Sequence, residues 1–322
     1  MKKPLARTTV LTTIIAAALL AAACTNAHAA GAAGGLEKTD LTVAAVPALD
    51  SAGLYIAKQR GLFAAEGLHV TILSAPSSAS VIAGQLAGKY DVTDGAYVSY
   101  MLADALHHAD LRVLAPASDM APFTQEVMVP AGSRIQNVGD LKGKKIGLNA
   151  LTGIGIILVS ALLQDNGVPP SDVTFVPIPF PKMAAALQSG QIAAAWLPEP
   201  FITAAEESIG AMAIADVDQG SAQGLPVSGY IVTQSWLNRY PKTAAAFRRA
   251  VLRAQAIANT DLGAVQNGMV AYGGTSRTTA EISAEPTYPL QTNPTLLQRI
   301  ADLMEQFGLT QQIFNASSIV RG

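Results

Sequence analysis

Six short segments of this 322-residue chain hold most of the side chains that could bind a small molecule. Each segment follows an apolar run typical of a strand and precedes a run typical of a helix, and each is rich in residues that cap helices and form tight turns. The six segments are residues 47–51, 76–80, 94–97, 149–153, 179–182 and 197–201. In open α/β sheets, ligands bind beyond the carboxyl ends of the strands, where helix N-termini present free N–H groups. The pattern indicates a binding cleft, although any one of these loops alone could be only a cap or a turn.

Acidic residues outnumber basic ones around these segments. The acids are Asp50, Asp94, Asp119, Glu126 and Glu199. The one nearby base is Lys182. Such a cleft suits an amine or a heterocycle that donates hydrogen bonds. An anion stays an alternative, because helix N-termini can hold a sulfonate or a phosphate without a basic side chain. For Trp196, stacking on a flat ligand and packing in the core both stay open.

Residues of common catalytic sites are scarce. The only cysteine is Cys24, there are four histidines, and no Gly-x-Ser-x-Gly sequence occurs. Asp104 and His108 could share a helix face as metal ligands do, but two such residues at a helix end are typical of a solvated surface. Gly153-Ile154-Gly155 begins like a dinucleotide-binding turn, yet Leu158 stands where the third glycine belongs. We therefore expect no enzyme, no metal and no cofactor.

Apolar runs and helix-like runs alternate from residue 40 onward, which predicts an α/β protein with mainly parallel sheets. The strand candidates are residues 41–46, 69–73, 91–93, 112–115, 126–129, 145–149, 173–178, 192–196, 212–215 and 230–233. The helix candidates that stop at a glycine are 52–60, 78–87, 154–166 and 182–189. Past residue 234 the pattern is helical, with runs at 241–260, 262–272, from 278, and 294–307.

A faint internal repeat points to two lobes. A helix flanked by two strand candidates lies between Gly67 and Gly95, and a similar unit lies between Gly167 and Pro198. Two lobes of similar build would produce such a repeat, although chance repetition in an α/β chain is the alternative.

The first residues are typical of an export signal. Basic residues at the start precede an apolar run that ends at Cys24 and is shorter than the ~20 residues that a spanning helix needs. We expect a signal peptide over residues 1–23, a lipid on Cys24, and a flexible tether over residues 24–39. Cleavage after Ala29, in Ala27-His28-Ala29, is the alternative.

The charge of the mature chain argues against nucleic acid as a partner. Without Lys2, Lys3 and Arg7, 18 of the 21 basic residues remain and face 23 acidic ones. A nucleic-acid-binding protein needs a basic surface to neutralise phosphates.

Five motifs, taken in order, resemble those of ABC-transporter solute-binding proteins of the nitrate/sulfonate/taurine type, a group that also includes binders of thiamine-pyrimidine precursors. The motifs are LYIAKQRGLF (54–63), EGLHV (66–70), GKYDV (88–92), DLKGKKIG (140–147) and WLPEPF (196–201). The resemblance implies a periplasmic-binding-protein-like fold, with two α/β lobes, a ligand cleft between them and two hinge-crossing strands near 123–130 and 225–233. We expect lobe I to comprise residues 40–124 and 231–322, and lobe II residues 125–230.

In this family the ligand contacts fall in the six loops. The candidate ligand-binding residues are Leu49, Asp50, Ser51, Ser77, Ser78, Asp94, Gly95, Ala96, Phe123, Thr152, Gly153, Trp196 and Glu199. The resemblance implies a small-molecule ligand, an ABC permease and ATPase as partners, and a place in the periplasm or on the outer face of the cytoplasmic membrane. We expect a monomer. A sensor or another non-transport lipoprotein is the alternative, followed by a pyrimidine-synthase-like enzyme, whose Cys-rich segment is absent.

Overall fold

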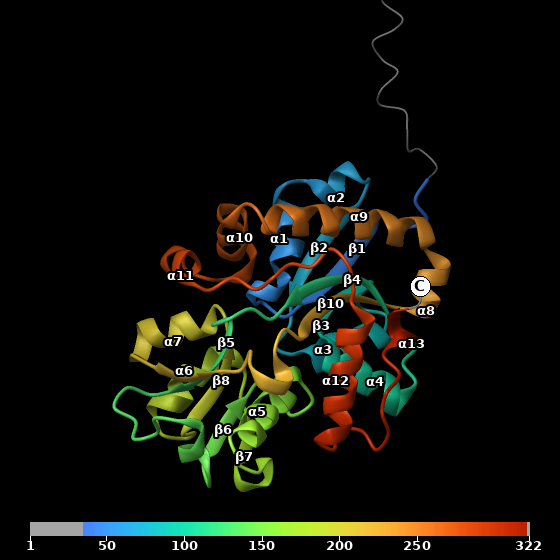
Figure 1. Cartoon of the computed structure of the whole chain (residues 1–322). Coiled ribbons are helices and arrows are strands. Elements are labelled where there is room, and N and C mark those ends of the chain that lie inside the picture. Colours follow the sequence, from blue (N-terminus) through green and yellow to red (C-terminus); the bar gives the residue numbers. More distant parts are fainter. Residues whose placement is uncertain (1–34, 321–322) are drawn as a thin grey trace, which may run out of the picture. The chain divides into compact units, whose positions relative to one another are not determined.

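Ten strands form two five-stranded sheets in the computed structural model, which describes residues 35–320 (Figure 1). The first sheet contains β1 (Asp40–Ala45), β2 (His69–Ser74), β3 (Val92–Ala96), β4 (Leu111–Asp119) and β10 (Pro226–Thr233). The second contains β5 (Gln125–Val129), β6 (Lys145–Leu148), β7 (Thr174–Pro177), β8 (Ala194–Pro198) and β9 (Met212–Asp216). Both sheets belong to the unit that begins at Glu37.

The two sheets share one strand order. The first runs β2-β1-β3-β10-β4 and the second runs β7-β6-β8-β5-β9. In each sheet three parallel strands lie beside one inserted strand, β10 or β5, which is antiparallel to both of its neighbours. The predicted repeat occupies equivalent places in the two sheets, because β2 and β3 correspond to β7 and β8. The expected α/β class with two lobes is confirmed.

The chain crosses between the sheets twice. Residues 120–124 lead from β4 to β5, and residues 217–225 lead from β9 to β10. β10 begins at Pro226 and pairs along its length with the first sheet, so the expected lobe boundary after residue 230 falls inside a strand. The division into lobes at residues 124 and 230 otherwise stays a prediction.

Helices cover both sheets (Figure 1). Those of the sheet-forming region are α1 (Ala52–Gln59), α2 (Leu62–Ala65), α3 (Ser78–Leu86), α4 (Tyr97–His107), α5 (Ile154–Asp165), α6 (Phe180–Gln188) and α7 (Phe201–Ile209). The tail forms α8 (Gln234–Arg239), α9 (Pro241–Ala258), α10 (Leu262–Gly268), α11 (Arg277–Ile282), α12 (Pro294–Gln306) and α13 (Ser317–Val320). Helix α9 packs on α1 and α2, whereas α12 contacts α4 of the first lobe and α5 of the second. None of the helices within residues 35–320 is both long and apolar enough to cross a membrane.

Every strand candidate overlaps an observed strand, but several ends differ. β3 continues through Asp94 to Ala96, residues that we placed in the following loop, because they pair with β10. β8 runs over Ala194–Pro198 and not over 192–196, because the Ile192 amide still donates to the Ala186 carbonyl at the end of α6. The run 262–272 is α10 followed by a π-helical turn at Met269–Gly273.

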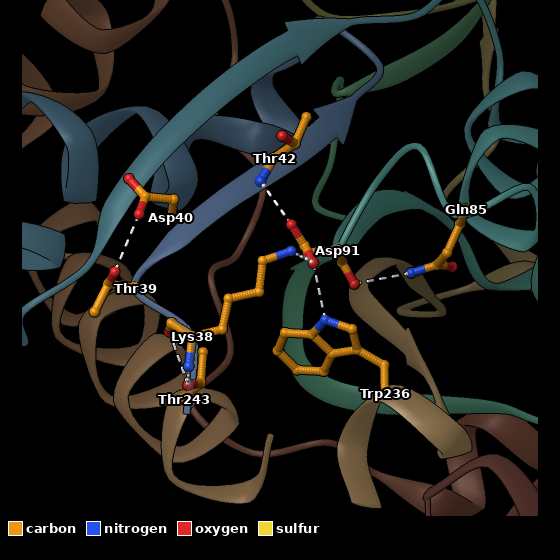
Figure 2. Close-up of polar contacts among 8 residues, drawn as sticks. All are labelled: Lys38, Thr39, Asp40, Thr42, Gln85, Asp91, Trp236 and Thr243. Atoms are coloured by element: carbon orange, nitrogen blue, oxygen red, sulfur yellow. Dashed lines mark hydrogen bonds and ion pairs between the residues drawn. The ribbon is translucent and has the colours of Figure 1, made fainter. Parts of the chain in front are cut away.

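Asp91, at the end of the first sheet opposite the loops predicted to bind, joins three segments (Figure 2). One carboxylate oxygen forms an ion pair with the Lys38 ammonium and accepts a 3.0 Å hydrogen bond from the Trp236 indole. The other oxygen accepts from the Thr42 amide of β1 at 2.9 Å. The side chain therefore fixes the start of β1 against β3 and α8.

Candidate ligand-binding site

A cavity lies between the two sheets and is lined by both of them. It has about 540 Å³ of space between its lining atoms, its mouth included. All six predicted loops contribute to the lining. The predicted residues that line the cavity are Asp50, Ser51, Ser78, Asp94, Gly95, Ala96, Gly153 and Trp196. The other lining residues are Val46, Ala48, Ser99, Gln125, Asn149, Ala150, Ile154, Phe180, Pro198, Val227 and Ser228.

Asp94 is the most buried acid of the cavity, with 1% of its surface exposed. Its Oδ2 lies 2.7 Å from the Ser51 hydroxyl, and that hydroxyl also lies 3.0 Å from the Val46 carbonyl oxygen. A hydroxyl has one proton, so when Ser51 donates to Val46 the proton between Ser51 and Asp94 must come from the carboxyl group. Burial raises the pKa of Asp94 well above its usual value, and the Asp50 charge adds to this. When the Ser51 hydroxyl donates to the carboxylate, that hydrogen bond opposes the rise in the pKa.

Asp50 is the second carboxyl group of the lining. It accepts a 2.6 Å hydrogen bond from the Ser118 hydroxyl, which lies 3.1 Å from the hydroxyl of Ser228. Burial raises the pKa of Asp50 to about 6, and the bond from Ser118 opposes this rise. The chain of hydroxyls runs from β10 through β4 to the turn before α1, and it holds Asp50 at the cavity.

The end of β3 needs a glycine. A Cβ atom on Gly95 would lie 2.8 Å from the hydroxyl oxygen of Ser78, at the start of α3. The same hydroxyl accepts a 3.0 Å hydrogen bond from the Ala96 amide. The missing side chain therefore lets β3 approach α3 closely, next to Asp94.

Trp196 and Phe180 form an aromatic wall in the second lobe. Their ring centroids are 5.6 Å apart, and Phe180 stacks on Phe201 at 5.0 Å. Trp196 is only 3% exposed and packs so closely on α5 that a Cβ on Gly155 would lie 2.4 Å from its ring. Trp196 thus belongs to the core and lines the cavity as well, so the two interpretations of this residue are compatible.

Five predicted residues lie outside the cavity lining. They are Leu49, Ser77, Phe123, Thr152 and Glu199. Ser77 caps α3 by accepting from the Ser80 amide, and Phe123 is 63% exposed at the first crossing, where its amide donates to Asp216. Their role as ligand contacts stays a prediction, as it does for the residues that line the cavity.

The other three residues, Leu49, Thr152 and Glu199, form hydrogen bonds that join the two lobes or hold the tail of the chain. The Thr152 carbonyl accepts a 2.8 Å hydrogen bond from the Ser99 hydroxyl of α4, and the Leu49 amide donates to the Glu199 carbonyl at 3.4 Å. The buried Glu199 carboxylate accepts from the Thr203 hydroxyl at 2.8 Å and from the Ala284 amide at 3.3 Å. These residues join the two sides of the cavity at its rim.

The acids expected near the hinge lie close to the crossings. Burial raises the pKa of Asp119 to about 6, and burial with the charges of Asp216, Glu206 and Glu199 raises that of Glu126 to about 7. Lys182, the base expected nearby, is exposed and is absent from the lining. Across residues 35–320, no cluster of three or more His, Cys, Asp or Glu side chains is arranged to hold a metal ion.

Two lobes of the same strand order, two crossings and a cavity between the sheets define the class of protein: the periplasmic-binding-protein fold. The chain belongs to the NMT1/THI5-like family, whose model matches residues 48–261. The resemblance found in the motifs is therefore confirmed at the level of family and fold.

One relative is the nitrate import ATP-binding protein NrtC of Synechocystis sp. (strain ATCC 27184 / PCC 6803 / Kazusa), 25% identical over 239 residues. The match covers 68% of this chain and 35% of NrtC, so the chain spans about a third of that relative.

Three solved structures share the fold. The alkanesulfonate-binding protein SsuA of Xanthomonas axonopodis pv. citri, bound to MOPS, has a TM-score of 0.77 at 18% identity and covers 89% of this chain and 100% of its own. The nitrate-binding protein NrtA of Synechocystis PCC 6803 has a TM-score of 0.76 at 14% identity, with coverages of 88% and 86%. The desulfurization enzyme DSZB has a TM-score of 0.68 at 18% identity, with coverages of 88% and 96%.

Proposed function

We propose that this chain is the extracytoplasmic solute-binding component of an ABC importer and that it captures a small polar molecule by closing its lobes. The observation that carries this proposal is that all six loops at the strand ends of two sheets line one cavity. A ligand there would meet backbone groups and short polar side chains from both lobes, so it would stabilise the closed arrangement. The names of SsuA, NrtA and NrtC support an importer as the partner.

Two contacts at the rim support closure. The Ser99 hydroxyl bonds to the Thr152 carbonyl, and the Leu49 amide bonds to the Glu199 carbonyl. Each contact joins a residue of the first lobe to one of the second, so opening would break both. Closure can be measured by small-angle scattering, in which a ligand should reduce the radius of gyration, whereas an unchanged radius at saturation would contradict it.

A binding role suits the cavity better than catalysis does. In the described part of the chain, no cysteine, histidine or lysine lines the cavity, so the Ser51 hydroxyl, which is paired with the buried Asp94, has no histidine or lysine beside it to act as a general base. The fold shared with DSZB does not change this chemistry, because function depends on the site.

Anchoring through Cys24 is part of the proposal, although Cys24 and the signal peptide lie outside the described residues. We expect Cys24→Ser to release the protein from membranes into the soluble periplasmic or medium fraction. Membrane fractionation followed by immunoblotting measures this, with the wild-type chain as the control. A Cys24→Ser protein that stays on the membrane would mean that another element anchors it.

Ligand binding is tested by a thermal-shift screen, because a ligand at 100 times its Kd adds about 2.7 kcal/mol to the free energy of unfolding. The panel should include taurine, alkanesulfonates, nitrate, hydroxymethylpyrimidine analogues and flavins. Uptake of the best ligand by cells with and without the gene then tests delivery. The importer role would be refuted if no ligand of the panel stabilises the protein and if uptake of these ligands by cells does not depend on the gene.

A further inference from the structure

The exposed face of α9 is basic over most of its length. Lys242, Arg248, Arg249 and Arg253 are all exposed on it, and residues 234–258, which form α8 and α9, contain no acidic residue. Lys242, Arg249 and Arg253 follow one another after seven and four residues, so the helix places them along one line. The chain as a whole has a formal net charge of −2, so this face is opposite in sign to the average of the molecule.

Few of these charges are neutralised by a neighbour. Arg249 forms an ion pair with Glu66 at 2.7 Å. The ion pairs within residues 35–320 include none of the other three cations of α9. Arg239 of the adjacent helix α8 is also exposed and takes part in none of these pairs. A surface with this charge attracts an anionic partner.

The first turn of α9 also binds the segment that leads to the expected lipid anchor. The Glu37 carboxylate accepts hydrogen bonds from the Lys242 amide at 3.2 Å and from the Thr243 amide at 3.0 Å, so it caps a helix that has no side-chain cap at its own N-cap residue. The Lys38 amide donates to the Thr243 hydroxyl at 3.1 Å (Figure 2). Glu37 and Lys38, which we expected in a flexible tether, are therefore fixed to α9.

This attachment limits how far α9 can lie from a membrane. Glu37 is the thirteenth residue after Cys24, and a chain of that length spans at most about 45 Å when fully extended. The cations from Lys242 to Arg253 extend about 16 Å along the helix, starting at the attached turn. A lipid on Cys24 would therefore keep this face near the headgroups, where a weak attraction is sufficient because the second contact is intramolecular.

We propose that the basic face formed by Arg239, Lys242, Arg248 and Arg253 binds anionic phospholipid headgroups and so orients the anchored protein on its membrane. The inference rests on the proposed anchoring through Cys24 and adds an orientation to it. Because α9 packs on α1 and α2, the outer side of the first lobe would face the lipid. A membrane explains why the cations gather on the helix that holds the anchored end of the chain, whereas an acidic protein partner could meet any face.

Vesicle co-sedimentation of the Cys24→Ser chain tests this, because that chain has no cysteine to carry a lipid. We expect it to bind vesicles of phosphatidylglycerol and phosphatidylcholine but not vesicles of phosphatidylcholine alone. Raising the salt from about 0.05 M to about 0.5 M should abolish the binding, because salt screens exposed charges. Combining Lys242→Gln, Arg248→Gln and Arg253→Gln should weaken it by about tenfold or more, since each basic residue near an anionic surface contributes about fivefold.

A second triple variant is the matched control. Lys144→Gln, Lys145→Gln and Lys182→Gln remove the same charge from exposed lysines of the second lobe, none of which takes part in an ion pair within residues 35–320. Its vesicle binding should stay within about twofold of the parent chain, because these lysines lie outside α8 and α9. Glutamine is a good helix former, so circular dichroism should show both variants folded.

Three results would overturn the assignment. They are equal binding to both kinds of vesicle, an equal loss of binding in the two triple variants, and a folded α9 variant that binds like its parent. If the Cys24→Ser chain binds no vesicle but the α9 variant lowers uptake, the face contacts a protein and the lipid assignment is wrong. Membrane fractionation in high salt removes the contribution of α9, so it reports on the Cys24 anchor alone and separates failure of the anchor from failure of this inference.

Discussion

Replacing Gly155 by alanine tests how the aromatic wall of the cavity is held. The new Cβ would lie 2.4 Å from Cε3 and 2.7 Å from Cζ3 of Trp196. Contacts this short do not persist, so either the indole or helix α5 must move. Both movements displace the side of the cavity that Trp196 forms.

The size of the effect follows from two opposing contributions. Overpacking a filled core costs about 1–3 kcal/mol, whereas replacing glycine by alanine inside a helix gains up to about 1 kcal/mol. Gly155 is the second residue of α5, where the helical gain is smaller than in the interior. We expect a net loss of about 1–2 kcal/mol in the free energy of unfolding. For a chain of this size, that lowers Tm by roughly 2–8 °C.

Urea unfolding followed by circular dichroism measures this change, and near-ultraviolet dichroism reports the displaced indole. Gly263→Ala is the matched control, because its Cβ would come no closer than 3.4 Å to the Asp261 carboxylate, and it should be as stable as the wild type or more so. Trp196→Phe should reduce the cost of Gly155→Ala when the two are combined. A Gly155→Ala protein with wild-type stability and an unchanged near-ultraviolet spectrum would refute the packing argument.

Three further predictions concern other parts of the molecule. Asp91→Ala should lower the free energy of unfolding by about 2 kcal/mol, because the Trp236 indole and Lys38 lose their common partner, whereas Asp40→Ala should change it by less than about 0.5 kcal/mol in the same urea assay. Because burial raises the pKa of Asp50 in the folded state to about 6, the folded protein holds this proton more tightly than the unfolded chain, so stability should fall as pH rises from about 4 past 6. Asp50→Asn should flatten that fall, by at most about 3 kcal/mol between pH 4 and 8, and an unchanged pH profile would assign the effect to other acids. Ser99→Ala should raise the Kd of the identified ligand about fivefold by removing one closing hydrogen bond, and an unchanged Kd would show that this bond does not contribute to closure.

The sequence was sufficient to place the strands and the loops, because both depend on local patterns. The apolar runs mark where each strand lies, and the polar loops follow from the rule that strand carboxyl ends meet at one edge of a sheet. Asp50, Ser51, Asp94 and Gly153 were predicted in this way, and all four line the cavity.

The rest of the site depends on pairing between distant segments, which no local pattern contains. Gln125 and Ser228 line the cavity because β5 and β10 are inserted between strands far away in the sequence. Glu199 and Phe123 lie outside the cavity lining, because Glu199 accepts from Thr203 and Phe123 is exposed at a crossing, and their role as ligand contacts stays a prediction. The residues that Glu199 and Phe123 contact can be identified only once the folded arrangement of the two lobes is known.

The shared strand order places the cavity beside the two crossings. In each sheet the inserted antiparallel strand is the one that the chain enters directly after a crossing. Gln125 is the first residue of β5 and Ser228 the third of β10, so both cavity residues lie next to the crossing segments. Under the proposed function, a ligand in the cavity would contact β5 and β10 directly, so its binding energy would act on the angle between the two lobes with no intervening element.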